Sequence, residues 1–375
     1  MVTRLDIDES VLSFYIKQSH TPLEQIKKKV KNVDLFISGK KQPTFNQLIE
    51  ISKLIHVPTG LLLLSKKINT DNTRLDFRTI NSKIINSDGI SSELRDTIDE
   101  MQIKQDFLKN ELDIKLDFIG KYSINDDYLL LSNIIRKKLG IGVDHHLDKM
   151  FKRNPLHFFR TKINNLGIFV FFNGKVKDNT HRPLNIKEFR GFVLSDTIAP
   201  IIFINQADSK TGQLFTLIHE LIHIFIGEEG IFNDTEVNNH SNKVEAFVNK
   251  VTAELLVPAQ SINQLDTLDI NELANKFRVS KFVIARRLLD NKYISYDKYK
   301  EISEELQKEF EDNEKYITKK STQGNYKNNL TFRMDNHFFY HVENALNQNR
   351  ISYTEAFSVL GVGYKGFKSL QEVHK

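Results

Sequence analysis

The sequence predicts an α+β fold that is mostly α-helical, with a small β-sheet packed on a pair of helices and helical modules on either side. Strand-like apolar runs occur only between residues 167 and 205, where turn residues separate them. Helical apolar spacing recurs before and after that stretch. The helix expected at residues 215–227 follows the last strand closely and is apolar almost all round, as in a buried helix.

The composition excludes several classes of protein. Hydrophobic residues make up 40% and charged residues 27% of the 375 positions, which is typical of a soluble globular protein. Cysteine is absent, which excludes disulfides, thiolate metal ligands and cysteine-protease chemistry, and fits a reducing cytoplasm. The first residues lack the apolar segment of a signal peptide, and no apolar run is long enough to span a bilayer. We therefore expect a cytoplasmic protein without membrane contact.

The first predicted domain, residues 1–66, consists of short helices. Thr21 is the expected N-cap of the second helix and Pro22 its first residue, because proline is favoured at that position. The expected helices are Leu5–Gln18, Pro22–Val30, Val33–Ser38 and Phe45–Ile55.

Three further domains are expected. Residues 67–150 form a helical connecting region, with helices at 91–114 and 129–139. Residues 151–295 hold the strands, expected at 167–172, 189–194 and 200–205, and the residues that suggest chemistry. Residues 296–375 form a helical C-terminal region with a polar linker near 318–329 and helix-turn-helix character at 351–362. Packing and partner docking are both open roles for this last region.

The chemistry centres on His219-Glu220-Leu221-Ile222-His223, an H-E-x-x-H pattern. Residues four apart lie on one face of a helix, so the two imidazoles can take two corners of a zinc tetrahedron. Glu220 projects about 100° further round, where its carboxylate can take a proton from a zinc-bound water. Since burying these groups without partners is costly, a metal ion with its water accounts for them better than a purely structural core.

A catalytic zinc also needs a third protein ligand and an open position. The helical pattern at residues 244–257 offers Glu245 and Glu254, which are nine residues apart and therefore on opposite faces. Only one of them can face the metal. Glu245 shares its face with Asn249, a candidate partner for a metal ligand. The expected loop before this helix holds weaker candidates: Asp234, Glu236 and His240.

This region resembles the ImmA/IrrE metallopeptidases, in which the H-E-x-x-H helix precedes a helix reading E-x-x-A-N-x-F-A-x-x-L-L-x-P. The glutamate, asparagine, paired leucines and proline of that motif match residues 245–258, and the order of motifs from Arg190 to Glu220 is also similar. The resemblance implies one zinc ion per chain, held by His219, His223 and Glu245, with Glu220 as general base. It also implies a protein substrate, a repressor or other regulator encoded nearby on a mobile element.

Residues 38–48 resemble the end of an XRE-type helix-turn-helix, which implies that this module contacts DNA. Here the stretch 23–39 is about three residues shorter than usual, at the turn and the start of the helix that would read bases. The remaining candidates are lysines that contact phosphates without reading sequence, and partner docking or a solvated basic face are alternatives. The candidate contacts are Lys27, Lys28, Lys31, Lys40 and Lys41.

The sequence thus predicts a zinc metalloendopeptidase. One edge of its sheet is expected to hold a substrate peptide as an added strand. The side chain that stabilises the oxyanion is left open, with His181 and His240 as candidates. The alternative is a DNA-binding or antitoxin-like regulator whose zinc is structural or sensory, but a structural site seldom leaves an open position beside a buried carboxylate.

Overall fold

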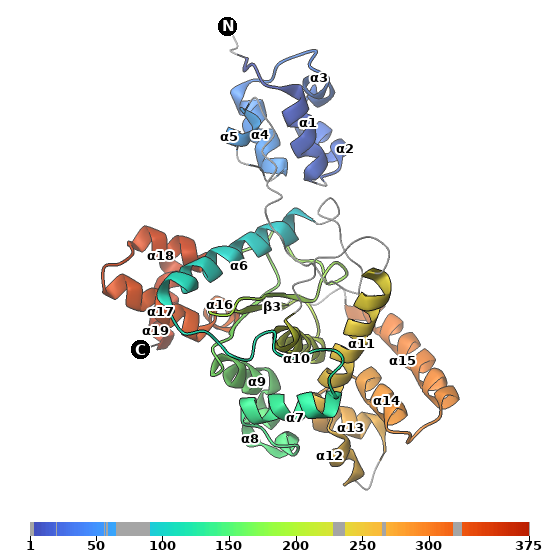
Figure 1. Ribbon diagram of the computed structural model, residues 1–375. Coiled ribbons are helices and arrows are strands. Elements are labelled where there is room, and N and C mark those ends of the chain that lie inside the picture. Colours follow the sequence, from blue (N-terminus) through green and yellow to red (C-terminus); the bar gives the residue numbers. More distant parts are fainter. Residues whose placement is uncertain are drawn as a thin grey trace. The chain divides into compact units, whose positions relative to one another are not determined.

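The chain forms two compact units, Met1–Phe77 with Ile84–Ile98 and Arg78–Lys83 with Asp99–Lys375. The computed structural model, shown in Figure 1, describes residues 4–19, 21–55, 57, 59–64, 91–227, 237–264, 268–317 and 325–374. Many helices and one three-stranded sheet confirm the predicted α+β, mostly α class. Within these ranges, no helix has the length and apolar character needed to cross a membrane.

The N-terminal unit packs short helices around a small apolar core that includes Leu12, Ile26 and Leu48. Its first helix begins at Glu9 rather than Leu5, because Asp8 caps it and the Leu5 N–H donates to the Pro43 carbonyl. The helices are α1 Glu9–Gln18, α2 Leu23–Lys29, α3 Val33–Ile37, α4 Phe45–Ile55 and α5 Thr59–Leu62.

The prediction for the start of α2 is wrong. Pro22 is itself the N-cap residue, and no side chain caps the helix. The Thr21 hydroxyl instead donates to the Leu54 carbonyl at 3.2 Å. This bond satisfies a carbonyl in the last turn of α4 and ties the two helices together.

The sheet of the second unit has the order β1-β3-β2, with strands β1 Phe169–Asn173, β2 Gly191–Leu194 and β3 Ile201–Asn205. The central strand β3 pairs in parallel with β1 and antiparallel with β2. Every residue of β1 and β3 is buried, so both faces of the sheet are covered.

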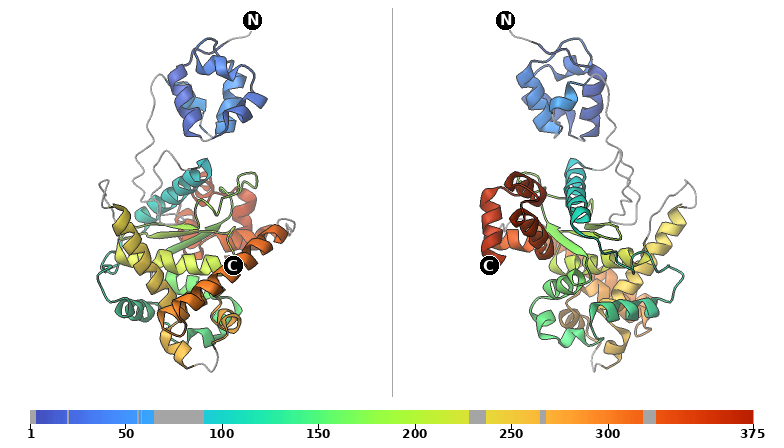
Figure 2. Two further views of the ribbon diagram at one scale, coloured as in Figure 1. Left: turned by 90° about the vertical axis from the view of Figure 1, so that its right-hand side faces the viewer. Right: turned by 60° about the vertical axis from the view of Figure 1, so that its left-hand side comes forward.

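Helices surround this sheet. In Figures 1 and 2, the C-terminal helices α16–α19 gather on one side of it, and α13–α15 lie on another. The first part of the expected connecting region, residues 67–90, and most of the expected linker at 318–329 fall outside the described residues. The helices are α6 Ser92–Glu111, α7 Tyr128–Leu139, α8 Lys149–Arg153, α9 Pro155–Asn164, α10 Lys210–Ile226, α11 Val237–Leu256, α12 Ala259–Asn263, α13 Ile270–Phe277, α14 Lys281–Asp290, α15 Tyr296–Ile317, α16 Tyr326–Arg333, α17 Asn336–Asn347, α18 Tyr353–Leu360 and α19 Tyr364–His374.

Helix α10, which carries the H-E-x-x-H residues, is fixed at several points along its length. The Ser209 hydroxyl accepts from the Gly212 N–H at its start. On the sheet side, a Cβ added to Gly191 would lie 2.6 Å from the Thr216 methyl carbon, so β2 and α10 approach too closely for any side chain there. The helix ends at Gly227 in the left-handed region, with φ of 62° and Gly120 directly against it.

Two side chains, one of them fully buried, close the outer edge of β1 at Val170. The Asp335 carboxylate accepts from the Val170 N–H at 2.8 Å, and an Arg160 N–H donates to the Val170 carbonyl at 2.6 Å. Arg160 also donates to the carbonyls of Phe332 and Met334. These bonds fasten the C-terminal helices to the sheet, because Asp335 is fully buried and caps α17.

Candidate metal centre

Helices α10 and α11 bring three donor side chains to one point. The Nε2 atoms of His219 and His223 lie 3.1 Å apart. The Glu245 carboxylate reaches both rings: Oε2 is 3.3 Å from Nε2 of His219, and Oε1 is 3.4 Å from Nε2 of His223. Among the described residues, these three form the one group of His, Asp, Glu or Cys side chains with metal-ligand spacing.

The spacing of these atoms fits a tetrahedral metal ion. Ligands about 2.0–2.1 Å from a tetrahedral zinc are about 3.3–3.4 Å from one another. The His219–His223 separation of 3.1 Å is close to that edge length, and so is the shortest distance from each imidazole to the carboxylate, 3.3 Å to Oε2 and 3.4 Å to Oε1. Taken as one ligand atom per residue, the three groups lie within 4.8 Å of one another. The buried Oε1 atom of Glu245 also accepts no hydrogen bond from any described residue. A cation bound between the three groups would satisfy it.

The electrostatics of the cluster favour a positive charge at its centre. Burial raises the pKa of the Glu245 carboxyl, but the imidazoles of His219 and His223 lower it further, so the net pKa is below its ordinary value. Burial lowers the pKa of His219, while Glu245, Glu220 and Asn249 together raise it above its ordinary value. A proton or a metal ion can supply the charge, and the two compete for the same nitrogens.

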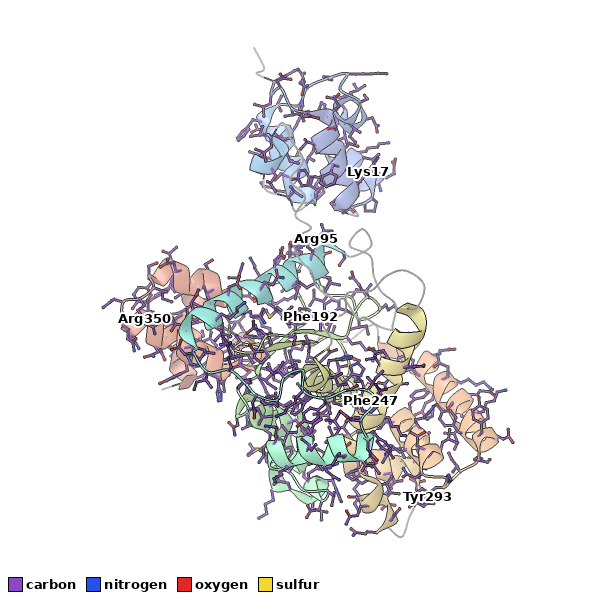
Figure 3. All side chains as sticks on the ribbon, in the orientation of Figure 1. Lys17, Arg95, Phe192, Phe247, Tyr293 and Arg350 are labelled. Atoms are coloured by element: carbon purple, nitrogen blue, oxygen red, sulfur yellow. The ribbon has the colours of Figure 1, made fainter. Side chains whose placement is uncertain are left out.

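Asn249 lies one turn after Glu245 on α11 and sets the orientation of one imidazole. Its Oδ1 atom is 3.1 Å from Nδ1 of His219. Because an amide oxygen only accepts, Nδ1 carries the proton and the Nε2 lone pair faces the cluster. Phe215, one turn before His219 on α10, packs its ring 6.2 Å from the imidazole. Figure 3 labels Phe247, a half-buried residue on α11 that also contacts the apolar core.

Glu220 is buried on α10 directly beside His219, with 8% of its surface exposed. Its negative charge helps to raise the pKa of His219. The arrangement thus combines three potential metal ligands with a second carboxylate that is not among them. Such a set can hold a metal ion and a base near the same point.

The other carboxylate of α11 belongs to a separate buried network. Glu254 pairs with Arg287 of α14, whose Nε also donates to the Val257 carbonyl. Arg136 of α7 donates to the carbonyls of Glu254 and Leu255, in the last turn of α11. This network satisfies the C-terminal carbonyls of α11 and gives the helix pair α13–α14 a structural role.

The structure describes only some of the remaining candidates. Helix α11 begins at Val237, so His240 lies in a helix and not in the expected loop. Asp234 and Glu236 lie outside the described residues. His181 is exposed in the turn region between β1 and β2, where its N–H donates to Asn179, and no contact with the cluster is present within the described chain.

The lysines of the N-terminal unit differ in their surroundings. Lys27 forms ion pairs with Glu24 and Asp34, which reduces the charge that it can offer to a phosphate. The short helix α3, with five residues, exposes Asp34 and Leu35. The other candidates form no ion pair with a described residue and lie at least partly exposed: Lys28, Lys31, Lys40 and Lys41.

Residues 163–289 match the family model of the IrrE N-terminal-like domain, Peptidase_M78. The match indicates a peptidase. It supports the resemblance to the ImmA/IrrE family, and it includes the whole cluster together with β1, β2 and β3. No curated protein and no solved structure matches the chain.

The sequence patterns missed two features near the cluster. Phe215 stands at the same four-residue spacing as the two histidines, so its place on their face could have been inferred. An ion pair between Arg190 and Asp208 fixes the start of β2 near the start of α10. Eighteen residues separate that pair in the chain, and no local pattern indicates it.

Proposed function

We propose that the protein is a zinc-dependent endopeptidase that cleaves a specific regulatory protein. One zinc ion per chain would be held by His219, His223 and Glu245, with Glu220 as general base. The convergence of one donor atom from each of these three residues within 4.8 Å of one another, beside a buried carboxylate, carries this proposal. The peptidase match over the same residues supports it.

Glu220 and Asn249 would have different roles in hydrolysis. When bound, zinc lowers the pKa of a water molecule and polarises the peptide carbonyl. Glu220 accepts the proton that the attacking water loses, and it then delivers that proton to the leaving nitrogen. Asn249 holds the His219 ring so that Nε2 keeps its direction throughout.

The outer edge of β2 offers a place for the substrate backbone. The Asn205 N–H donates to the Arg190 carbonyl at 2.8 Å, and hydrogen-bonded pairs alternate along an antiparallel ladder. Gly191 and Val193 therefore turn their N–H and C=O groups away from β3. In the described part of the chain, no hydrogen bond reaches these outward groups. An extended peptide can pair with them as an added strand.

Of the two edges of the described sheet, the β2 edge suits the role better, since Asp335 and Arg160 occupy the outward groups of Val170 on β1. The position of β2 is also suitable, because Gly191 lies against Thr216, one turn before Glu220 on α10. A peptide on the β2 edge would therefore run beside the cluster, with its carbonyl groups near the metal ligands.

We further propose that the substrate is a repressor or similar regulator encoded nearby, acted on in the cytoplasm. This rests on the family resemblance and on a site suited to one extended segment. For the N-terminal unit we propose contact with DNA phosphates through its exposed lysines. A short α3 that exposes Asp34 and Leu35 leaves few groups for reading bases.

The test is Glu220→Gln, with Glu272→Gln on the exposed surface of α13 as the matched control. Purified proteins are incubated with zinc and the regulator encoded beside this gene, and the products are analysed by mass spectrometry. We expect the Glu220 variant to keep its zinc and lose cleavage, and the control to keep both. Equal cleavage by all three proteins would instead support a structural or sensory zinc.

A further inference from the structure

An exposed arginine stands at the start of the open edge of β2. The side chain of Arg190 is 49% exposed, and its Nη1 group donates to Oδ2 of Asp208 at 3.0 Å. Arg190 directly precedes Gly191, the first residue whose backbone groups face the outer edge of the sheet. A peptide paired with that edge would therefore pass the guanidinium.

The partner carboxylate is held rigidly. Only 6% of the Asp208 side chain is exposed, and its Oδ1 accepts from the Ser209 N–H at 2.7 Å. It packs against the first turn of α10, where a Cβ added to Gly212 would lie 2.5 Å from the carboxylate. Glycine at 212 thus makes room for Asp208, and Asp208 in turn fixes the position of the arginine.

Most of the hydrogen-bonding capacity of Arg190 is unused. A guanidinium carries five N–H donors in a planar fork, and the ion pair with Asp208 uses one. The others have no partner among the described residues. A planar fork with spare donors, half exposed and fixed in place, binds a carboxylate in a bidentate way.

The spacing along α10 gives the distance from the metal cluster. Gly212, which contacts Asp208, precedes His219 by seven residues, or about 10.5 Å along the helix axis. An extended peptide advances about 3.3 Å per residue. The guanidinium therefore lies about three residues from the bond that faces the cluster.

We propose that Arg190 selects substrates with an aspartate or glutamate about three residues from the scissile bond. This inference rests on the proposed function, because it assumes that the β2 edge holds the substrate. If Arg190 only linked β2 to α10, it would need the ion pair with Asp208 but no unused N–H donors. The two roles therefore predict different results for peptide selection.

The experiment measures peptide binding by the zinc-loaded Glu220→Gln protein, which on our account binds without cutting. Two pools of random dodecapeptides are used, identical except that one fixed position carries Asp in one pool and Asn in the other. Retained peptides are sequenced by mass spectrometry. We expect retention of the Asp pool to exceed that of the Asn pool by about tenfold.

Three further substitutions, each in the Glu220→Gln background, assign the selectivity. Arg190→Gln should abolish it, and Arg190→Lys should retain part of it because the charge remains without the fork. Arg286→Gln is the matched control, since Arg286 is an exposed arginine with one ion pair on α14. Circular dichroism checks that each variant is folded.

The results separate this proposal from the proposed function. Equal retention of both pools, retention of neither pool, or selectivity that survives in Arg190→Gln would overturn the role of Arg190. Zinc content and cleavage by the wild-type protein are measured independently. If the protein selects acidic peptides but holds no zinc and cuts nothing, the proposed peptidase function is refuted. The proposed binding of acidic residues by Arg190 would still be supported.

Discussion

Two glutamates on α11 should respond differently, in zinc content and in stability, when each is changed to glutamine. Glu245 faces the histidine cluster, and Glu254 faces Arg287 on the other side of the helix. We expect Glu254→Gln to reduce stability without loss of zinc. We expect Glu245→Gln to lose zinc, and with it only the part of the stability that zinc binding supplies.

The magnitude follows from the burial of the Glu254–Arg287 pair. The exposed fractions of the two side chains are 10% and 1%, so neither charge has water to replace a lost partner. Breaking one half of a buried ion pair costs about 3–5 kcal/mol, because the other charge stays buried and unpaired. A domain is stable by about 5–15 kcal/mol in total, so the loss would be a large share of it.

Urea unfolding followed by circular dichroism gives the free energy of unfolding, and mass spectrometry under native conditions gives the zinc content. The double variant Glu254→Leu/Arg287→Met serves as the control, because an apolar pair of similar volume removes both charges and should restore most of the stability. Zinc loss in Glu254→Gln with unchanged unfolding would refute our assignment of the two faces of α11.

Two further predictions concern the framework around the site. Gly191→Ala should cost about 1–3 kcal/mol and weaken zinc retention, because its Cβ would lie 2.6 Å from the Thr216 methyl carbon on α10. Gly363→Ala meets nothing within 4 Å and should change the melting temperature little; equal effects of the two substitutions would contradict the close approach. Burial, and then the charge of Arg136, lowers the pKa of His145 to about 3, so the unfolded chain binds a proton near pH 6.5 that the folded protein excludes. Acidification of the metal-free protein from pH 7 to pH 5 should therefore remove about 2 kcal/mol of stability through His145. His145→Asn should show a correspondingly flatter dependence on pH in urea unfolding, and an unchanged slope would refute this.

Local signals in the sequence account for much of the fold. Phe45–Ile55 forms a helix with the predicted limits, and the three strands lie within about two residues of their predicted positions. The rotation of 100° per residue along a helix also predicts that Glu245 and Glu254 face opposite sides. In the structure Glu245 contacts His219 and Glu254 contacts Arg287. These features depend on residues close together in the chain, which is why periodicity and capping patterns indicate them.

Features that depend on distant residues were not predictable in this way. The parallel pairing of β1 with β3 and the closure of the β1 edge by Asp335 join segments up to 165 residues apart. Thr21 has the residue type of a helix cap but bonds to Leu54 instead, because the packing of α2 on α4 offers it a different acceptor. Strand pairing and hydrogen-bond partners of this kind depend on tertiary contacts, which no local sequence pattern indicates.

The central claim is that this chain holds a catalytic zinc through His219, His223 and Glu245. The most direct test is the metal content of the purified wild type beside His219→Ala, Glu245→Ala and Glu220→Gln. We predict about one zinc ion per chain in the wild type and in Glu220→Gln, and none in the other two. A well-folded wild-type protein that binds no zinc even after incubation with the metal would contradict the claim.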